Sequence, residues 1–393
     1  MNPYFLPDII EQKLIQIIQK YCRNDFSLIR MTETMLKKSI IDASDSLRVI
    51  LRDNEIVNYG EIKQEEKLYK AVTVFNKGDA ISRDTSFYRP KTKSGDPRFW
   101  ISRFTHFVNV GQLVYFTVYR DELIAIPLIG YEHFEDDIRS FFGADNTDDQ
   151  IIEELRQKIS LLKARGWIES TSPYKSNPKD AGETLEQCLG ISANSLISAD
   201  YMGEIELKTK RANSGNRDTL FSMIPDWENS TVKSSTDMML KYGYPSRKYE
   251  GFQDLYVTVN NNPNNQGLFM GVDDAKEQVF QHSLVNGIEE EACIWGYSDV
   301  KRRLLEKHPK TMWIIAEEKV FDGKIHFNYV SVELTQRPIF TQFTSLIQQG
   351  LVVYDWRGRV RIDRTGYKDK GHCFRMNPRD RHLLFGETKM LEI

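Results

Sequence analysis

Cysteine is scarce in this sequence and forms no recognisable pattern. The chain of 393 residues has four cysteines, none of them in a Cys-x-x-Cys spacing. This usage argues against a structural zinc site and against a disulfide scaffold, and it fits a reducing cytoplasm. The cysteines are Cys22, Cys188, Cys293 and Cys373.

Long apolar runs and targeting patterns are also missing. No run approaches the roughly 18 apolar residues that cross a bilayer as a helix. The first residues, MNPYFLPDIIEQK, do not combine a basic region with a following apolar region, so we expect no signal peptide. A hydrophobic content of 40% and a charged content of 28% are typical of a soluble globular protein without a membrane segment.

Net charge is small, which argues against a generic polyanion binder. The formal charge is −3, but residues 355–381 hold nine Lys/Arg against four Asp, and residues 83–103 hold six against two. Basic stretches in a mildly acidic chain favour specific DNA contact, because the acidic remainder limits non-specific binding. Solvated loops are the alternative. Within residues 83–103, the segment Arg98-Phe99-Trp100 could stack on DNA bases. The alternative is that its aromatic rings belong to the core and the arginine reaches the surface.

The amino-terminal part combines helical and strand patterns. Apolar residues recur at helical spacing within residues 1–60, and β-branched and aromatic runs separated by turns fill residues 69–129. The runs are AVTVF, HFVNV, LVYFTVY and LIAIPLI. With a helix expected over residues 148–165, they predict a helical and β-barrel-like first domain, residues 1–165, which is a possible DNA-contacting module.

A second domain is expected over residues 170–393. Residues 170–180, STSPYKSNPKD, carry two prolines and indicate a linker or an edge loop. From Thr184 onward, helical and strand patterns alternate. This alternation predicts an α/β core with a mixed sheet flanked by helices.

The segment Ala199–Lys210, ADYMGEIELKTK, has a strand pattern that contains a Glu-x-Lys motif. Side chains alternate faces along a strand, so Glu206 and Lys208 point one way and Leu207 points into the core. Asp200 before the strand and Glu206 can hold Mg²⁺, which prefers hard oxygen ligands. Lys208 can orient the attacking water and stabilise the charge that develops on phosphate. The alternative is an ion pair on a solvated strand face.

The surroundings of this strand resemble a known family of nucleases. The segment GETLEQCLG, residues 182–190, indicates a helix that ends at a Gly cap, and TLFSMIP, residues 219–225, follows the Glu-Leu-Lys strand. This order is similar to the MutH-like branch of the PD-(D/E)XK nucleases, and it is most similar to the MvaI/BcnI family of type II restriction endonucleases. Further matching segments, which extend the resemblance over about residues 175–390, are KYGY at 241–244, YDWR at 354–357, GHCFR at 371–375 and LLF at 383–385.

The resemblance implies a PD-(D/E)XK restriction-endonuclease-like core with a defined catalytic set. Carried over by position, the set comprises Glu186, Asp200, Glu206 and Lys208, with Asp200 and Glu206 as ligands of Mg²⁺. Asp200 lies one residue closer to the glutamate than in MutH. Glu204, on the same expected strand face as Glu206, is a competing ligand.

The resemblance places base recognition in the carboxy-terminal third. Asp355 and Arg357 are two residues apart on an expected strand and therefore share a face. An arginine fork suits guanine N7 and O6, and a carboxylate can accept from a cytosine amino group. Arg375 is a second candidate for guanine, and His372 is a candidate for DNA contact. An exposed ion pair on the strand is the alternative interpretation.

These observations predict a sequence-specific, Mg²⁺-dependent type II restriction endonuclease that hydrolyses phosphodiester bonds in double-stranded DNA at a short G·C-rich site. The resemblance implies a monomer and a cognate DNA methyltransferase that protects the same site. A MutH-like strand-nicking enzyme and a DNA-binding protein with a decayed nuclease core are the alternatives. Cleavage of both plasmid strands without added proteins separates the first hypothesis from the second, and a chelator-sensitive cleavage assay excludes the third.

Overall fold

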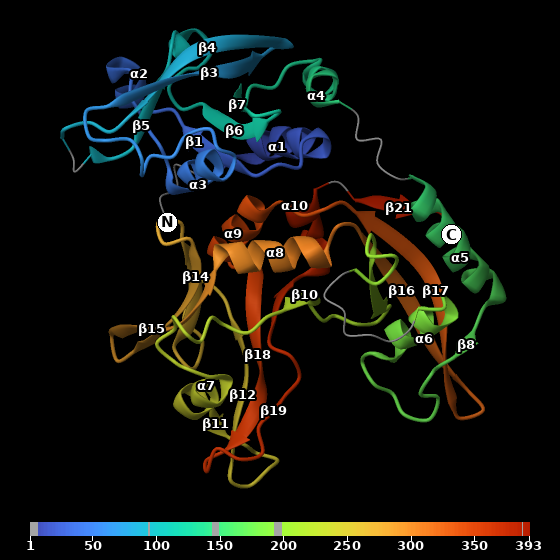
Figure 1. Ribbon diagram of the computed structural model, residues 1–393. Coiled ribbons are helices and arrows are strands. Elements are labelled where there is room, and N and C mark those ends of the chain that lie inside the picture. The colour runs from blue at the N-terminus through green and yellow to red at the C-terminus, as the bar shows by residue number, and fades with distance from the viewer. Residues whose placement is uncertain (1–6, 93–94, 144–148, 192–198, 387) are drawn as a thin grey trace. The chain divides into compact units, whose positions relative to one another are not determined.

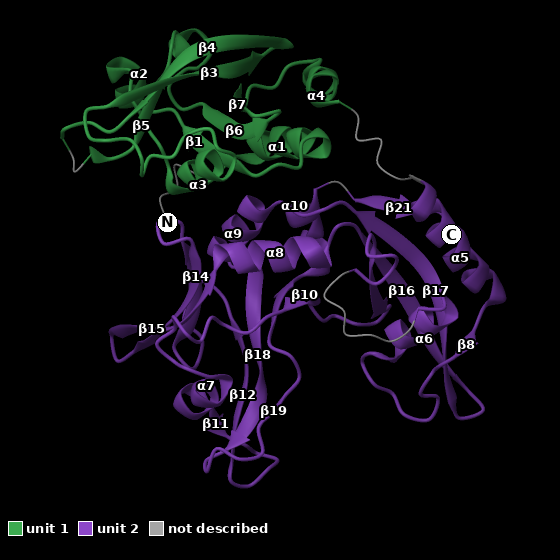
Figure 2. Ribbon diagram, in the orientation of Figure 1, with its two compact units in different colours: residues 1–146 green, residues 147–393 purple. Residues whose placement is uncertain are grey.

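The protein is described from a computed structural model, whose described residues are 7–92, 95–143, 149–191, 199–386 and 388–393. The chain divides into two compact units, residues 1–146 and 147–393 (Figure 2). This boundary precedes the helix α5 (Asp149–Arg165), which the sequence predicted as the end of a first domain. Leu155 and Ile159 of α5 belong to the same hydrophobic cluster as Leu207, so the helix is part of the second unit.

The first unit is built around one seven-stranded sheet in the order β1-β6-β7-β3-β4-β5-β2 (Figure 1). β3 and β7 are parallel, and the other neighbouring strands are antiparallel. The strands β1 and β2 lie at the two ends of this strand order. The expected barrel-like form of the first domain stays a prediction. The elements are α1 (Ile9–Tyr21), β1 (Phe26–Arg30), α2 (Glu33–Lys38), β2 (Ile41–Asp42), α3 (Asp45–Asp53), β3 (Lys67–Asn76), β4 (Asp79–Tyr88), β5 (Arg98–Ile101), β6 (Leu113–Tyr119), β7 (Glu122–Pro127) and α4 (Phe134–Phe142).

Two parts of this sheet differ from the expected strands. The run HFVNV, residues 106–110, is not a strand, because a 3-10 helix at Phe104–His106 leads into a turn. Conversely, β1 and β4 were not predicted. β1 is short and lies among helical patterns, and β4 is polar over much of its length. Both strands form through pairing with β6 and β3, which a local pattern does not report.

Several side chains of the basic stretch 83–103 are used inside the first unit. Phe99 is fully buried, and the guanidinium of Arg98 lies 3.0 Å from Asp42. Trp100 is partly buried and packs against the same hydrophobic cluster. For Arg98 and Phe99, the structure therefore supports the interpretation as core residues rather than DNA contacts.

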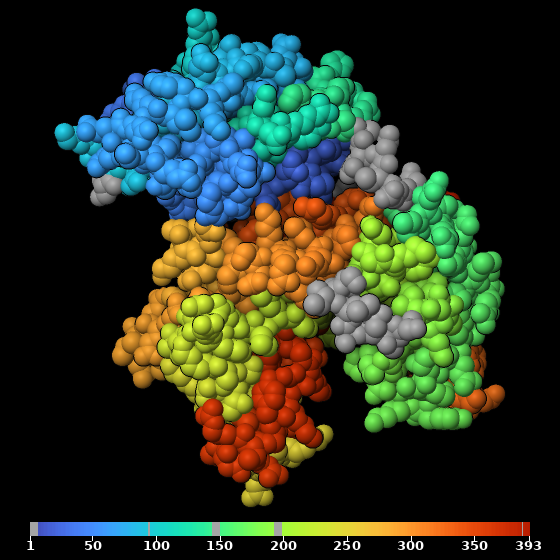
Figure 3. All heavy atoms as spheres, in the orientation of Figure 1, coloured from blue at the N-terminus to red at the C-terminus, as the bar shows by residue number. Residues whose placement is uncertain are grey.

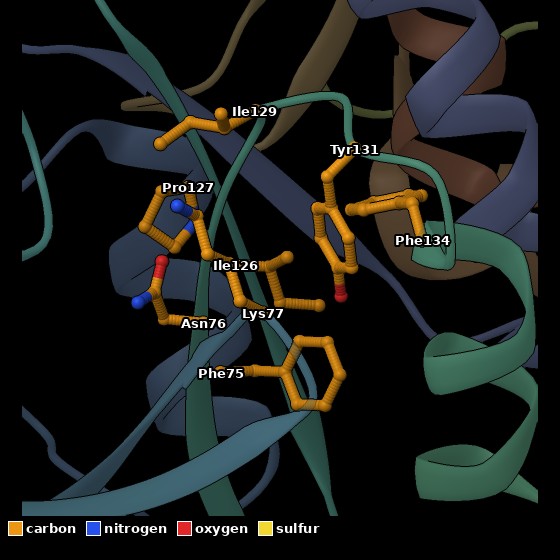
Figure 4. Close-up of a pocket in the computed structure, with 8 residues that line it drawn as sticks. All are labelled: Phe75, Asn76, Lys77, Ile126, Pro127, Ile129, Tyr131 and Phe134. Atoms are coloured by element: carbon orange, nitrogen blue, oxygen red, sulfur yellow. The ribbon is translucent and has the colours of Figure 1, made fainter.

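A small pocket lies in the first unit, where the chain leaves β7 (Figure 4). Aromatic and aliphatic side chains line it, and none of the predicted catalytic residues does. The lining residues are Phe75, Asn76, Lys77, Ile126, Pro127, Ile129, Tyr131 and Phe134.

The described residues of the second unit form three sheets. One has the order β21-β17-β16-β9, with β8 paired to β17; another has the order β10-β20-β18-β12-β11, with β19 paired to β18; the third has the order β13-β14-β15. The strands are β8 (Ile168–Glu169), β9 (Glu206–Arg211), β10 (Asp218–Ser222), β11 (Tyr244–Pro245), β12 (Phe252–Val259), β13 (Leu268–Asp273), β14 (Gln278–Val285), β15 (Ile288–Gly296), β16 (Thr311–Phe321), β17 (Lys324–Thr335), β18 (Val352–Arg361), β19 (Lys368–Asp369), β20 (Cys373–Met376) and β21 (Lys389–Leu391). The helices besides α5 are α6 (Asp180–Cys188), α7 (Ser235–Tyr242), α8 (Tyr297–Lys307), α9 (Phe340–Gln348) and α10 (Arg381–Phe385).

The helix expected before the strand with the Glu-x-Lys motif is confirmed as α6. It ends just before Gly190, whose φ of +73° suits glycine because a side chain is strained in that conformation. The strand itself is shorter than expected. β9 begins at Glu206, and residues 199–205 form a turn closed by the bridges Ala199↔Gly203 and Tyr201↔Ile205.

β9 pairs in parallel with β16, and β16 pairs antiparallel with β17. Leu207 is buried in the cluster that covers one face of this sheet, as the alternating pattern predicted. Glu206 and Lys208 therefore lie on the opposite face. Among the described residues, no helix is both long and apolar enough to cross a membrane.

Candidate active site

The predicted carboxylates Asp200 and Glu206 meet where β9 begins. Glu206 is fully buried as the first residue of the strand. Asp200 lies in the preceding turn, and its Oδ2 accepts a hydrogen bond of 3.0 Å from the backbone N–H of Leu207. This bond fixes the aspartate beside the strand. Glu204 is exposed in the turn and outside the strand, so the predicted shared strand face with Glu206 is not present.

Two lysines form ion pairs with the buried carboxylate of Glu206. Lys208 Nζ contacts Glu206 Oε1, as expected from residues two apart on one strand face. Lys307 Nζ, from the end of α8, lies 2.8 Å from Glu206 Oε2 and 3.5 Å from Asp200 Oδ1. One ammonium group thus spans both carboxylates.

Lys307 is a site residue that the sequence did not reveal. It lies about a hundred positions beyond β9, in a helix without a distinctive motif. The register explains its position, since Thr311 at the start of β16 pairs with Glu206 at the start of β9. A residue shortly before β16 is therefore brought to the carboxylates. The signal available in the sequence was a lysine at the end of a helix directly before an apolar strand.

Glu186 joins the carboxylates from α6. Burial raises the pKa of Glu186, and the charges of Asp200, Glu183 and Glu206 raise it further, whereas Lys208 lowers it. Burial also raises the pKa of Glu206, with Lys208 and Lys307 opposing that effect and Asp200 adding to it. Concentrated negative charge of this kind favours a bound cation.

The residues fit a divalent metal ion. The buried oxygen Glu206 Oε2 has the ion-pair distance to Lys307 but no hydrogen-bond partner among the described residues. Lys307 shows that a cation can reach Asp200 and Glu206 together. Among those residues, three or more ligands are not gathered at one point. Mg²⁺ at phosphate-processing sites is commonly held by one or two carboxylates, which matches this pair.

The predicted recognition residues lie on the six-stranded sheet. Asp355 and Arg357 share one face of β18, opposite to Tyr354 and Trp356, which are buried in the core. Asp355 Oδ1 accepts from the Thr258 hydroxyl at 2.7 Å.

Asp355 and Arg375 form a pair on adjacent strands of this sheet. Arg375 Nη1 lies 2.6 Å from Asp355 Oδ2, and the buried Arg375 Nε has no hydrogen-bond partner among the described residues. The carboxylate thereby orients the arginine fork. The structure brings these two predicted residues together, an arrangement that the sequence left open.

His372 has a supporting position rather than an exposed one. It is 2% exposed, and its Nδ1 accepts a hydrogen bond of 3.0 Å from the backbone N–H of Arg357. Its ring also packs against Trp356 at 4.7 Å between centroids. Burial lowers the pKa of His372 to about 4. This hydrogen bond fixes the backbone that carries Arg357, and direct contact of His372 with DNA stays a prediction.

A buried histidine joins the sheet of β9, β16 and β17 to the six-stranded sheet. His308 Nε2 donates to the carbonyl of Leu220 in β10 at 2.8 Å, so its Nδ1 accepts from the hydroxyl of Thr311 in β16 at 2.7 Å. Burial, with a further contribution from the positive charges of Lys208 and Lys307, lowers the pKa of His308 from 6.5 to about 3.

The free energy of unfolding is expected to fall as pH falls below about 6.5. The unfolded chain takes up a proton at His308 in this range, and the folded chain does not, since its pKa is about 3. One such histidine costs about 2 kcal/mol between pH 7 and pH 5. Urea unfolding followed by tryptophan fluorescence checks this. His308→Gln is expected to remove part of the pH slope, whereas His382→Gln, at an exposed position, leaves it; an unchanged slope in His308→Gln contradicts the assignment.

Comparison with known proteins identifies the family of this chain. The model of the MvaI/BcnI restriction endonuclease family matches residues 156–385, which lie within the second unit. The chain belongs to the MvaI/BcnI restriction endonuclease family.

A solved structure of restriction endonuclease MvaI is similar in fold to this chain. A complex of MvaI with its cognate DNA substrate covers 62% of this chain and 99% of its own, with a TM-score of 0.54 and 21% sequence identity. MvaI in the absence of DNA covers 63% of this chain and 100% of its own, with a TM-score of 0.39 and 20% identity. No curated protein matches the chain.

Proposed function

We propose that the protein is a Mg²⁺-dependent type II restriction endonuclease that cuts double-stranded DNA at a short G·C-rich site. The observation that carries this proposal is the cluster of Asp200, Glu206 and Lys208 at the start of β9, in a chain of a restriction endonuclease family. In this proposal the enzyme acts as a monomer in the cytoplasm, and a cognate methyltransferase protects its site. The solved DNA complex of MvaI supports DNA as the substrate.

The proposed mechanism assigns a role to each side chain of the cluster. Mg²⁺ held by Asp200 and Glu206 would lower the pKa of a water molecule and neutralise charge on the scissile phosphate. Lys208 stabilises negative charge that develops on the phosphate. Glu186, whose pKa is raised, is suited to accept a proton from the attacking water. Lys307 holds both carboxylates in place before the substrate arrives.

The surface of the second unit offers a place for a duplex. Figure 3 shows a hollow between the red atoms around β18 and β19 and the green atoms around α6 and β8. The outer face of β18 carries Asp355, Arg357, Arg359 and Arg361 at alternate positions. A face rich in arginine suits both phosphate contact and guanine readout.

Arg357→Ala and Arg375→Ala are each expected to cost about 1–3 kcal/mol of discrimination at a G·C pair, because each removes an arginine fork from base edges. Competition binding with the cognate duplex and with a duplex of altered sequence measures this. Arg364→Ala, which removes an exposed arginine paired with Asp237, is the control. Equal losses on cognate and random DNA would mean that Arg357 and Arg375 contact phosphates only.

Digestion of unmethylated plasmid with Mg²⁺, followed by sequencing of the new ends, tests the proposed function directly. Discrete double-strand cuts at one short sequence, abolished by EDTA, are the expected result. Nicks alone would indicate a strand-nicking enzyme. Binding without cleavage would indicate a DNA-binding protein.

A further inference from the structure

A buried charge network joins the sheet of β9, β16 and β17 to the six-stranded sheet, and the proposed mechanism does not use it. Its centre is Asp218, the first residue of β10, which is 8% exposed. Asp218 Oδ1 lies 3.3 Å from Lys210 Nζ, and Asp218 Oδ2 accepts from Arg381 Nε at 2.8 Å. The two oxygens of one carboxylate therefore hold two cations from different parts of the unit.

Both cations belong to the surroundings of Lys208. Lys210 follows Lys208 on the same face of β9. The guanidinium of Arg381 lies 4.1 Å from the ring centre of Trp313, and Trp313 is the residue of β16 that pairs with Lys208. Arg381 also contacts Glu333 of β17. A displacement of Asp218 would therefore affect Lys210, two residues after Lys208 on β9, and Arg381, which contacts Trp313 on the neighbouring strand.

The other side of Asp218 connects to the predicted recognition residues. Arg375 Nη2 contacts the carbonyl of Arg217, the residue directly before Asp218. Thr219, directly after Asp218, pairs with Arg375 across β10 and β20. If Arg375 turns its fork toward a base, it must release protein acceptors such as the Arg217 carbonyl. The backbone carbonyl directly before Asp218 then loses its contact with the Arg375 side chain.

We propose that Asp218 is a positioning residue that couples base readout to the chemical step. It acts through Lys210 on β9, and through Arg381 on the ring of Trp313, the residue that pairs with Lys208. Charges in a poorly solvated interior interact strongly, so a small shift of this carboxylate changes the position of its partners. The inference rests on the proposed endonuclease function. A purely structural network is the alternative, in which Asp218 only stabilises the fold.

Asp218→Asn separates these possibilities because it keeps the size of the side chain and removes its charge. Glu333→Gln is the matched control, since it removes the other carboxylate from Arg381 and leaves the pairing of Asp218 with Lys210 intact. Single-turnover cleavage is measured on a duplex with the site found by plasmid digestion, and on a duplex with one G·C pair of that site exchanged. Duplex binding with Ca²⁺ and thermal unfolding are measured in parallel.

For Asp218→Asn we expect the rate constant on the cognate duplex to fall about 10- to 100-fold, as for a misplaced catalytic group. The affinity for the duplex is expected to stay within about threefold of the wild-type value. The ratio of cognate to altered-site rates is expected to fall, because base recognition no longer changes the position of Lys208. Glu333→Gln is expected to lower the unfolding temperature without this loss of rate. With enzyme in saturating excess over DNA, a misfolded fraction leaves the single-turnover rate constant unchanged.

An unchanged rate constant in Asp218→Asn, weaker binding with unchanged chemistry, or an equal rate loss in Glu333→Gln overturns the proposal. If Asp218→Asn does not fold, Lys210→Met takes its place and is expected to give the same loss of rate and of the rate ratio. Where both fold, the double variant is expected to lose no more than either single one, because the two residues act through each other. Wild-type protein is assayed in parallel with each variant. If the wild-type protein does not cleave the duplex, the proposed function is overturned instead.

Discussion

Replacing Glu206 with glutamine, or Asp200 with asparagine, is expected to abolish DNA cleavage. Each change removes a carboxylate that is proposed to hold Mg²⁺, at a point where Lys307 already bridges the two side chains. Loss of several kcal/mol of transition-state stabilisation corresponds to a rate reduction of about a thousandfold or more. Single-turnover cleavage with saturating enzyme measures the loss, and DNA binding in Ca²⁺ is expected to stay within a few-fold.

Glu204→Gln is the matched control for this prediction. Glu204 lies two residues before Glu206 but in the exposed turn, so its loss is expected to leave the cleavage rate nearly unchanged. Full activity in both Asp200→Asn and Glu206→Gln would contradict the assignment of the site. Loss of activity in Glu204→Gln together with activity in Glu206→Gln would transfer the ligand role to Glu204.

Lys208→Ala is expected to slow the chemical step about 100- to 1000-fold, the range seen when one group that stabilises developing negative charge is removed. Lys208 also lowers the pKa of Glu206, so its removal raises that pKa. The residual activity should consequently shift to higher pH, where Glu206 is again ionised. Cleavage rates over a range of pH measure both effects.

Lys324→Ala provides the comparison for Lys208→Ala. Lys324 forms an exposed ion pair with Glu169 in the same unit, and its loss is expected to leave the rate and its pH profile unchanged. A Lys208→Ala protein with weaker DNA binding and an unaltered single-turnover rate would make Lys208 a contact to the DNA backbone.

Local sequence patterns were sufficient to predict the elements whose signal lies within one segment. α5 and α6 were predicted because apolar spacing and a terminal glycine are visible within one segment. The burial of Leu207 and the strand β18 followed from alternation of side chains. Family membership was also predicted from the sequence, since the short motifs and their order can be recognised directly along the chain.

Elements that depend on pairing were harder to predict. The run HFVNV has strand-like residues but no partner strand, while β1 and β4 gain theirs from distant segments. The turn that shortens β9 removed Glu204 from the face of Glu206, although the spacing along the chain suggested otherwise. Propensity describes a residue's preference, and hydrogen bonding between strands decides the outcome.

The carboxylates and the lysine of the candidate site could be picked out in the sequence, because Asp200, Glu206 and Lys208 lie within one short segment. The partners of those residues were decided by the tertiary structure. Lys307 reaches Asp200 and Glu206 through the parallel register of β9 and β16, and Arg375 reaches Asp355 across neighbouring strands. Contacts between residues far apart in the chain arise from strand register and packing, which no local pattern encodes.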